Sequence, residues 1–318
     1  MKAAIVRGAG QSPVYGEFEE PVPQTGEVRI AVAAAAISHL VKVRAAGTHY
    51  SAANRFPFVA GVDGIGRRDD GSRVYFFMPR APFGSMAERT VVAAAQCIAV
   101  PDRLDDTTAA AIANPGMSSW AALSERAKLK AGETVLINGA TGTSGRLAVQ
   151  IAKVLGAKKI IATGRNPAAL QAVAALGADV TISLLQDEAS LAAALEQQFA
   201  EGIDVVLDYV WGPSALAVLT AAAKAGPDGV PIRFVQIGSL SGVSIALPAV
   251  VLRSSSIVMM GSGLGSVSRE GLLAAISGVF AAAASKGFTI AFKTVPLSDV
   301  AAAWAADDST NRTVFTVG

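Results

Sequence analysis

The sequence predicts an α/β protein that combines a doubly wound parallel β-sheet with a second, mostly β part. From about residue 115, helical stretches alternate with short apolar strands, an order typical of a parallel sheet with helices on both faces. Before that point, short β-like runs are separated by turns rich in proline and glycine. The chain has 318 residues, a length that suggests two domains.

The expected elements follow from local hydrophobic patterns. In the first part, β-like runs cover residues 2–8, 27–38, 72–78 and 88–100. In the second part, strands are expected at 135–137, 160–163, 203–210, 232–237 and 256–260, and helices at 170–176, from Pro213 onward and at 271–284. The end of the chain returns to mixed structure, with strands at 290–297 and 313–317 and a helix at 298–308.

A glycine-rich turn at residues 139–145 is the most informative motif. It lies between the expected strand 135–137 and an amphipathic helix, which makes a βαβ unit of Rossmann type with the strand at 160–163. Gly139 permits a sharp exit from the strand, Gly142 lets a pyrophosphate approach the backbone, and Gly145 lets the helix pack closely. The residues expected to contact the pyrophosphate are Gly139, Thr141, Gly142, Thr143, Ser144 and Gly145, beside the positive end of the helix dipole. The alternative is an ordinary strand-to-helix turn.

The end of the second strand of this unit indicates which dinucleotide is bound. NAD sites usually place Asp or Glu there, whereas this chain has Gly164, Arg165 and Asn166 and no acidic residue from 146 to 165. A guanidinium can bind a 2′-phosphate through charge-assisted hydrogen bonds, so the predicted cofactor is NADPH. In the alternative interpretation Arg165 is a solvated surface charge beside Asn166, which then caps a helix opened by Pro167.

The composition excludes several classes of protein. The chain is 52% hydrophobic and 16% charged, with a net charge of +2 and scattered basic residues, so we expect no nucleic-acid partner. The longest uncharged helical candidate, 271–284, is too short to span a bilayer, and the N-terminus resembles a strand rather than a signal peptide. We therefore expect no membrane association and a cytoplasmic location.

Metal ligands are scarce in this sequence. It has one cysteine, Cys97, and two histidines, His39 and His49, so it can form neither an internal disulfide nor a four-cysteine zinc site. Cys97 lies in an apolar run and is interpreted as a small buried apolar side chain. We expect no bound metal, and the lack of disulfides fits a reducing compartment.

Several segments resemble the medium-chain dehydrogenase/reductase superfamily, and within it the zinc-free quinone oxidoreductase branch. They are KAAIV at 2–6, the turn at 61–66, PGMSSWAAL at 115–123, AGETVLINGATGTSGRLAVQIAK at 131–153 and PLSDVAAAW at 296–304. The resemblance implies a GroES-like catalytic domain made of residues 1–114 and 285–318. It also implies a Rossmann domain for NADP at residues 115–284.

The chain departs from the family pattern at a few positions. Zinc-dependent members carry a His-Glu pair where this chain has Val62-Asp63. The quinone oxidoreductase branch usually has Asn and Asp where Ile37 and Leu40 stand here. The missing Asn leaves the substrate open.

The resemblance also assigns residues to the nicotinamide side of the site. Ser118 stands where the family commonly has a Thr. The other candidates follow the later strands and are Asp208, Tyr209, Ile237, Gly238, Ser239, Gly261, Ser262 and Gly263. Asp208 is interpreted either as a cofactor contact or as a helix cap, and Ser239 either as a contact or as a solvated turn hydroxyl.

The expected activity is NADPH-dependent hydride transfer, without zinc, to a quinone or an activated alkene. Tyr50 is the first candidate for the acid that binds the substrate oxygen, and His49 is the second. The alternatives are a zinc-free carbonyl reductase and a non-catalytic NADPH-binding sensor or structural protein. The resemblance further implies a small-molecule substrate and a homodimer formed through the strand at 256–260.

Overall fold

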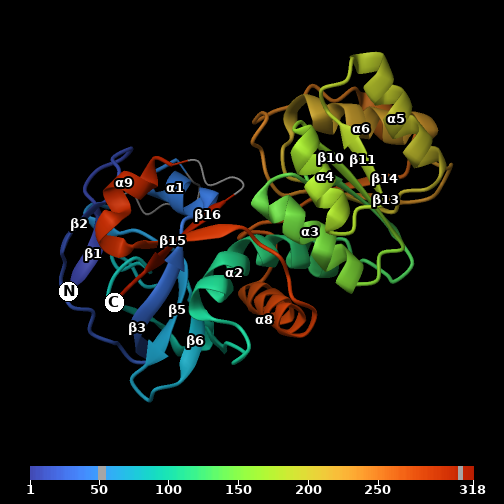
Figure 1. Cartoon of the computed structure of the whole chain (residues 1–318). Helices are drawn as coiled ribbons and strands as arrows, with labels where there is room; N and C mark the ends of the chain where they lie inside the picture. Colours follow the sequence, from blue (N-terminus) through green and yellow to red (C-terminus); the bar gives the residue numbers. More distant parts are fainter. Residues whose placement is uncertain (49–54, 307–310) are drawn as a thin grey trace. The chain divides into compact units, whose positions relative to one another are not determined.

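The computed structural model describes residues 1–48, 55–306 and 311–318 (Figure 1). The chain divides into two compact units. Unit 1 comprises Met1–Asn114 and Phe280–Gly318, and unit 2 comprises Pro115–Val279. Unit 2 has a parallel sheet with helices and unit 1 is mainly β, which confirms the fold class predicted from the sequence.

Unit 2 contains a six-stranded parallel sheet in the order β11-β10-β9-β12-β13-β14. The strands are β9 (Thr134–Asn138), β10 (Lys159–Gly164), β11 (Val180–Ser183), β12 (Val205–Asp208), β13 (Ile232–Gln236) and β14 (Ile257–Gly261). The helices between them are α3 (Thr143–Val154), α4 (Pro167–Ala175), α5 (Glu188–Ala200), α6 (Gly212–Ala225) and α7 (Ala249–Arg253). The strand order reverses between β9 and β12, and this switch point is where doubly wound sheets bind their ligands.

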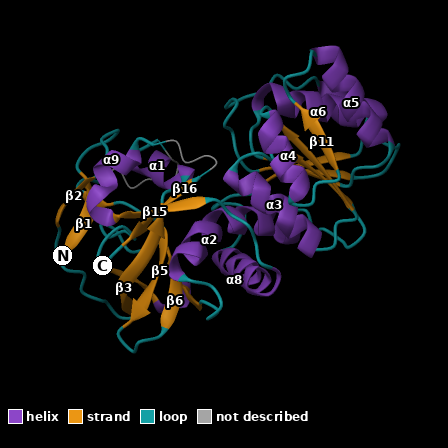
Figure 2. Ribbon diagram, viewed as in Figure 1, coloured by secondary structure: helices purple, strands orange, loops and turns teal. Residues whose placement is uncertain are grey.

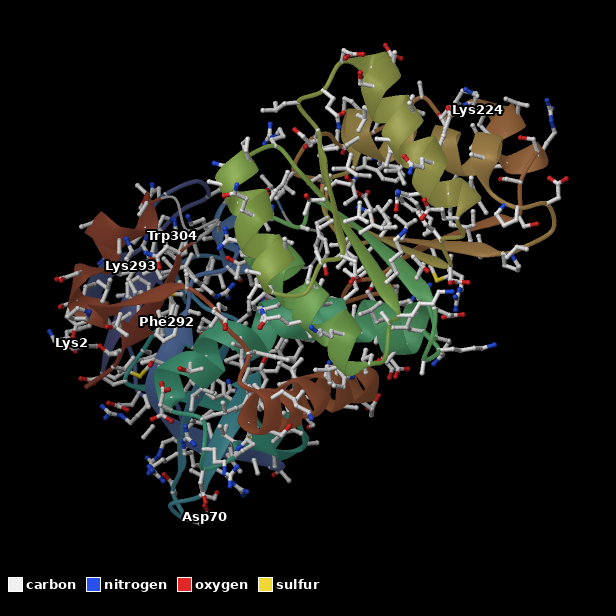
Figure 3. The ribbon with its side chains drawn as sticks, turned by 45° about the vertical axis from the view of Figure 1, so that its right-hand side comes forward. Lys2, Asp70, Lys224, Phe292, Lys293 and Trp304 are labelled. Carbon is white, nitrogen blue, oxygen red and sulfur yellow. The ribbon has the colours of Figure 1, made fainter. Side chains whose placement is uncertain are left out.

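Helices surround this sheet (Figure 2), and its central strands β9, β10 and β12 are buried on both faces. Alternate residues such as Leu136 and Val206 pack in one core with Phe199 of α5 and Leu219 of α6. The intervening residues, such as Val135, are equally buried, because side chains alternate between the faces of a strand. An ion pair of 2.8 Å between Lys224 and Glu196 joins α6 to α5 at the surface; Lys224 is labelled in Figure 3.

Two helices belong partly to each unit, and their unit 2 segments approach each other through glycines. They are α2 (Asp106–Ala121), which starts earlier than Pro115 and contains that proline, and α8 (Arg269–Lys286). A Cβ on Gly116 would lie 2.7 Å from Val279, and a Cβ on Gly278 would lie 2.5 Å from the Trp120 ring. Glycine is therefore required for the close packing of these two helices.

Unit 1 is built on two sheets. One has the order β2-β1-β4, and the other has the order β15-β16-β3-β5-β6-β8, with β7 also paired to β3. The strands are β1 (Lys2–Val6), β2 (Val14–Glu17), β3 (Glu27–Ala36), β4 (Phe58–Val59), β5 (Asp63–Arg68), β6 (Arg73–Phe77), β7 (Arg89–Ala93), β8 (Cys97–Ala99), β15 (Phe292–Pro296) and β16 (Arg312–Thr316). Two short helices, α1 (His39–Ala45) and α9 (Val300–Trp304), pack on them through Val41 and Trp304.

Two features of unit 1 differ from the sequence-based expectation. The run 88–100 is not one strand, because β7 pairs with β3 whereas β8 pairs with β6, and the 3-10 turn Ala94–Gln96 separates them. The strand expected to reach residue 38 ends at Ala36, since Ser38 caps α1 by accepting a hydrogen bond of 3.2 Å from the Val41 N–H.

Within residues 1–48, 55–306 and 311–318, no helix combines the length and apolar character needed to cross a bilayer.

Candidate dinucleotide-binding site

The candidate site lies at the carboxyl edge of the unit 2 sheet. All six strands are parallel, so the loops that follow β9, β10, β12, β13 and β14 emerge at the same edge. These loops, the strand ends before them and the first turn of α3 carry the cofactor-binding residues expected from the sequence, apart from Ser118, which lies on α2. The topology therefore gathers segments that are more than a hundred residues apart in the sequence.

The glycine-rich turn is held close to the strand it leaves. Gly139 has a φ of +84°, which favours glycine, and a Cβ there would lie 2.6 Å from Val210. A Cβ on Gly145 would lie 2.5 Å from the Ala140 Cα and 2.5 Å from the Gly139 carbonyl oxygen. The first turn of α3 is thus pressed against the loop, and any larger residue at these positions would displace it.

The N-terminus of α3 has no side-chain cap. Gly142 is the N-cap residue in an extended conformation, and no side chain accepts a hydrogen bond at the cap. A helix start of this kind presents backbone donors and a positive dipole end to an anion. The residues present therefore fit the pyrophosphate of a dinucleotide.

A buried chain of hydrogen bonds lies beneath the turn and joins three strands. The Thr163 hydroxyl of β10 donates to Asn138 Oδ1 of β9 at 2.7 Å and accepts from the Gly139 N–H at 3.1 Å. Asn138 Nδ2 donates to Asp208 Oδ1 of β12 at 2.8 Å and to Ser214 Oγ at 3.1 Å. We call Thr163, Asn138, Asp208 and Ser214 the strand-end network.

The side chain of Asp208 forms hydrogen bonds only with groups of the protein, among the described residues. Its side chain is completely buried and also accepts hydrogen bonds of 3.2 Å from the N–H groups of Val210 and Trp211. Burial raises the pKa of its carboxyl group, and the hydrogen bonds from Trp211, Asn138 and Val210 oppose that shift. The N-cap residue of α6 is Trp211, so Asp208 stabilises the connection before the helix rather than the helix start itself.

The end of β10 carries an exposed cation. In the part of the chain that the structure describes, no hydrogen bond or ion pair holds the guanidinium of Arg165. Asn166 caps α4, since its Oδ1 accepts a hydrogen bond of 3.0 Å from the Ala169 N–H. A Cβ on Gly164 would overlap the Thr141 side chain, which brings this strand end against the phosphate turn.

The loops that follow β13 and β14 are fixed by their own backbone contacts. The N–H groups of Ile237 and Gly238 both donate to the Asp208 carbonyl oxygen, at 2.8 and 3.2 Å. The Ser262 N–H donates to the Gln236 carbonyl oxygen at 2.8 Å. Further bonds of these loops include those from Gly242 N–H to the Ser239 carbonyl oxygen, from Gly263 N–H to Ser266 Oγ and from Arg126 Nε to the Gly261 carbonyl oxygen.

The Ser118 and Tyr209 hydroxyls lie at the same edge. Ser118 Oγ donates to the Pro115 carbonyl oxygen at 2.9 Å, and the Tyr209 hydroxyl lies 2.7 Å from Ser119 Oγ. Sequence reasoning missed Ser119, Asn138 and Thr163. The signal for the last two was a polar residue at the end of an otherwise apolar strand.

The two candidate acids, His49 and Tyr50, lie outside the described residues. The positions where the resemblance implied Asn and Asp are apolar: Ile37 is buried in the unit 1 core, and Leu40 packs against that core. These side chains offer no polar group to a substrate.

The described residues do not fit a zinc site. Residues 1–48, 55–306 and 311–318 contain no group of three or more His, Cys, Asp or Glu side chains placed so that they could hold a metal ion. Burial raises the pKa of the Cys97 thiol to about 11, which disfavours the thiolate that binds metal. Asp63, at the position of the zinc-dependent Glu, is buried and accepts a hydrogen bond of 3.2 Å from Tyr75.

Comparison with known proteins agrees with this architecture. Residues 145–278 match a family described as zinc-binding dehydrogenase. A probable NADPH-dependent quinone reductase of Emericella nidulans is 29% identical over 358 aligned positions, which cover all of both chains. The quinone oxidoreductase of Thermus thermophilus, solved also in complex with NADPH, is 25% identical with a TM-score of 0.82 and coverage of 99% of this chain and 100% of that one. A mycobacterial quinone oxidoreductase has the same fold, with 21% identity, a TM-score of 0.84 and 99% coverage of each chain.

The fold and the strand-end loops define a dinucleotide-binding protein of the Rossmann class. The family match, the fungal relative and the structural neighbours together place the chain in the medium-chain dehydrogenase/reductase superfamily, as quinone oxidoreductase-like.

We expect the strand-end network to contribute to the stability of the protein. Thr163→Val keeps the shape of the side chain but leaves the Gly139 N–H and Asn138 Oδ1 without their partner. The free energy of unfolding should fall by about 1–3 kcal/mol, because Asn138 Oδ1 stays buried and the Gly139 N–H stays half-buried. Urea unfolding measures this change.

Thr181→Val is the matched control, since Thr181 pairs with Ala162 on the neighbouring strand and is exposed. It should change stability by less than about 0.5 kcal/mol. Equal losses for the two variants would mean that the Thr163 hydroxyl has no special role.

Proposed function

We propose that this protein is an NADPH-dependent reductase of quinones or activated alkenes. The observation that carries the proposal is that two features lie together: an α3 N-terminus without a side-chain cap, pressed against a glycine turn, and at the neighbouring strand end the exposed Arg165, which has no partner among the described residues. The first fits a pyrophosphate and the second fits a 2′-phosphate. The names of the fungal quinone reductase and of the Thermus enzyme complexed with NADPH support the same cofactor.

Bound NADPH would supply a hydride from C4 of its nicotinamide. The chain must then bind the cofactor and the substrate, orient them and supply a proton to the substrate. The glycine turn holds the pyrophosphate, Arg165 neutralises the 2′-phosphate, and the loops after β12, β13 and β14 shape the nicotinamide side. Quinones and enones suit such a site because they carry the new negative charge on an oxygen, which a single hydroxyl or N–H group can stabilise.

Two alternatives use the same cofactor site. A carbonyl reductase without zinc would act on isolated C=O groups, and a non-catalytic NADPH-binding protein would show no turnover.

These possibilities are separated by following cofactor oxidation at 340 nm against a panel of quinones, enones and aldehydes. The assay is run with NADPH and with NADH, each with and without EDTA. We expect turnover of quinones or enones with NADPH that EDTA leaves unchanged. No turnover across the panel despite NADPH binding would contradict the proposal, and activity that is lost on chelation would contradict metal independence.

Arg165→Ala tests the cofactor choice. A charged hydrogen-bonded contact contributes about 1.5–3 kcal/mol, so this change should weaken NADPH binding about 10- to 150-fold and leave NADH nearly unchanged. Dissociation constants from fluorescence titration measure both effects. Lys158→Ala, which removes an exposed cation at the opposite end of β10, is the control and should alter neither constant. An equal weakening of NADPH and NADH binding would show that Arg165 does not bind the 2′-phosphate.

The proton donor is proposed from the sequence alone. Tyr50 is assigned to the substrate oxygen, with His49 as the second candidate. Tyr50→Phe should lower kcat about 10- to 1000-fold while the dissociation constant for NADPH stays the same. If Tyr50→Phe is fully active and His49→Ala is not, the assignment moves to His49, and if both are fully active neither residue is the acid.

We also propose that the protein is a cytoplasmic homodimer. Within unit 2, β14 is an edge strand, and Val258 on it is 47% exposed. Leu240, Val243, Val250 and Leu252 are exposed apolar residues that precede it in the chain. An uncovered apolar edge promotes association, and pairing with a second copy would cover it. Light scattering at micromolar concentration should give about twice the mass of one chain, and the mass of a single chain would contradict the proposal.

A further inference from the structure

Tyr209 lies directly after β12, and its side chain is almost wholly buried, with 7% of the residue exposed. Its hydroxyl is 2.7 Å from Ser119 Oγ, on a completely buried serine of α2. Burial raises the pKa of Tyr209 and outweighs the opposing effect of the Ser119 and Ser118 hydroxyls, so the phenol keeps its hydrogen and has one to donate. The phenol is therefore committed to an internal partner.

Ser119 also contacts the first turn of α3. Its Oγ lies 3.2 Å from the Ser144 carbonyl oxygen and 3.0 Å from the Pro115 carbonyl oxygen. A serine hydroxyl has one hydrogen, and the raised pKa of Tyr209 makes the phenol the donor to Ser119 Oγ. The Ser119 hydrogen is then shared between the Pro115 carbonyl oxygen of its own helix and the Ser144 carbonyl oxygen of α3, as a three-centre hydrogen bond.

We propose that Tyr209 and Ser119 are positioning residues whose hydroxyls hold the first turn of α3 where the cofactor pyrophosphate binds, and so set the affinity for the dinucleotide. We call this pair the hydroxyl latch. The inference rests on the proposed NADPH-binding function. It gives Tyr209, expected from the resemblance to be a cofactor contact, a role that acts through Ser119.

The latch adds a second contact to the first turn of α3, beside the close packing of Gly145. The close approach of Gly145 to Ala140 sets how near α3 lies to the turn. The bond from Ser119 to the Ser144 carbonyl fixes the same turn through α2. Hydrogen bonds weaken steeply as distance and angle depart from their optimum, so a small displacement of this turn weakens its bonds to a phosphate.

The latch acts on the part of the cofactor that NADPH and NADH share. Loss of the latch should therefore weaken both cofactors by the same factor, whereas loss of Arg165 should affect NADPH alone. Since one neutral hydrogen bond is involved, the expected weakening is about 2- to 10-fold.

The experiment measures dissociation constants for NADPH and NADH in the full chain for Tyr209→Phe, Ser119→Ala and the double variant. Each single variant should bind both cofactors about 2- to 10-fold more weakly than the wild-type protein. The double variant should bind no more weakly than the weaker of the two single variants, because Tyr209 acts through Ser119. Tyr75→Phe is the matched control: it also removes a buried phenol hydroxyl, here one that donates to Asp63, and it should lower thermal stability while leaving both constants unchanged.

The outcomes separate this inference from the proposed function. If the wild-type protein binds neither cofactor, the proposed function fails. If it binds NADPH and the latch variants bind equally well, the latch is overturned. Additive losses in the double variant, losses that differ between NADPH and NADH, or a lower kcat at saturating NADPH with unchanged affinity would each overturn it as well. Ser119→Ala alone gives the cofactor comparison if Tyr209→Phe does not fold.

Discussion

The hydrogen bonds among Thr163, Asn138 and Asp208 are the constraint on which the candidate site depends. They join the carboxyl ends of β9 and β12, which flank the switch point of the sheet, and of β10, the neighbour of β9. Each polar group is buried and has a partner within the network, and leaving any of them without one would cost about 1–3 kcal/mol. The Gly139 N–H belongs to the same network, so the phosphate turn starts from a fixed point.

Electrostatics at this edge favour an anion. The carboxylate of Asp208, the acidic residue at the end of β12, accepts hydrogen bonds from Asn138 and from backbone N–H groups. The α3 N-terminus has no side-chain cap, and Arg165 stands exposed beyond the neighbouring strand. A phosphate at this edge would meet donors and a guanidinium. The two phosphate regions of NADPH need such an arrangement.

The sequence predicted the fold class and the parts of the site that local patterns encode. The turn at 139–145 lies between β9 and α3 because glycine spacing and hydrophobic runs are local signals. The break between β7 and β8 was not predictable, since it depends on which distant strands these segments pair with. The same holds for Asn138, Thr163 and Ser119, whose partners are fixed by strand register and helix packing over distances of 25 to 90 residues in the chain.

Hydrogen–deuterium exchange of the protein with and without NADPH tests the central claim most directly. The account predicts slower amide exchange in peptides that cover residues 139–147 and 164–169 when NADPH is bound, because these segments would contact its phosphates. NADH should protect the first segment and leave the second nearly unchanged. Protection by NADPH confined to other parts of the chain, with these two segments exchanging as in the free protein, would contradict the account.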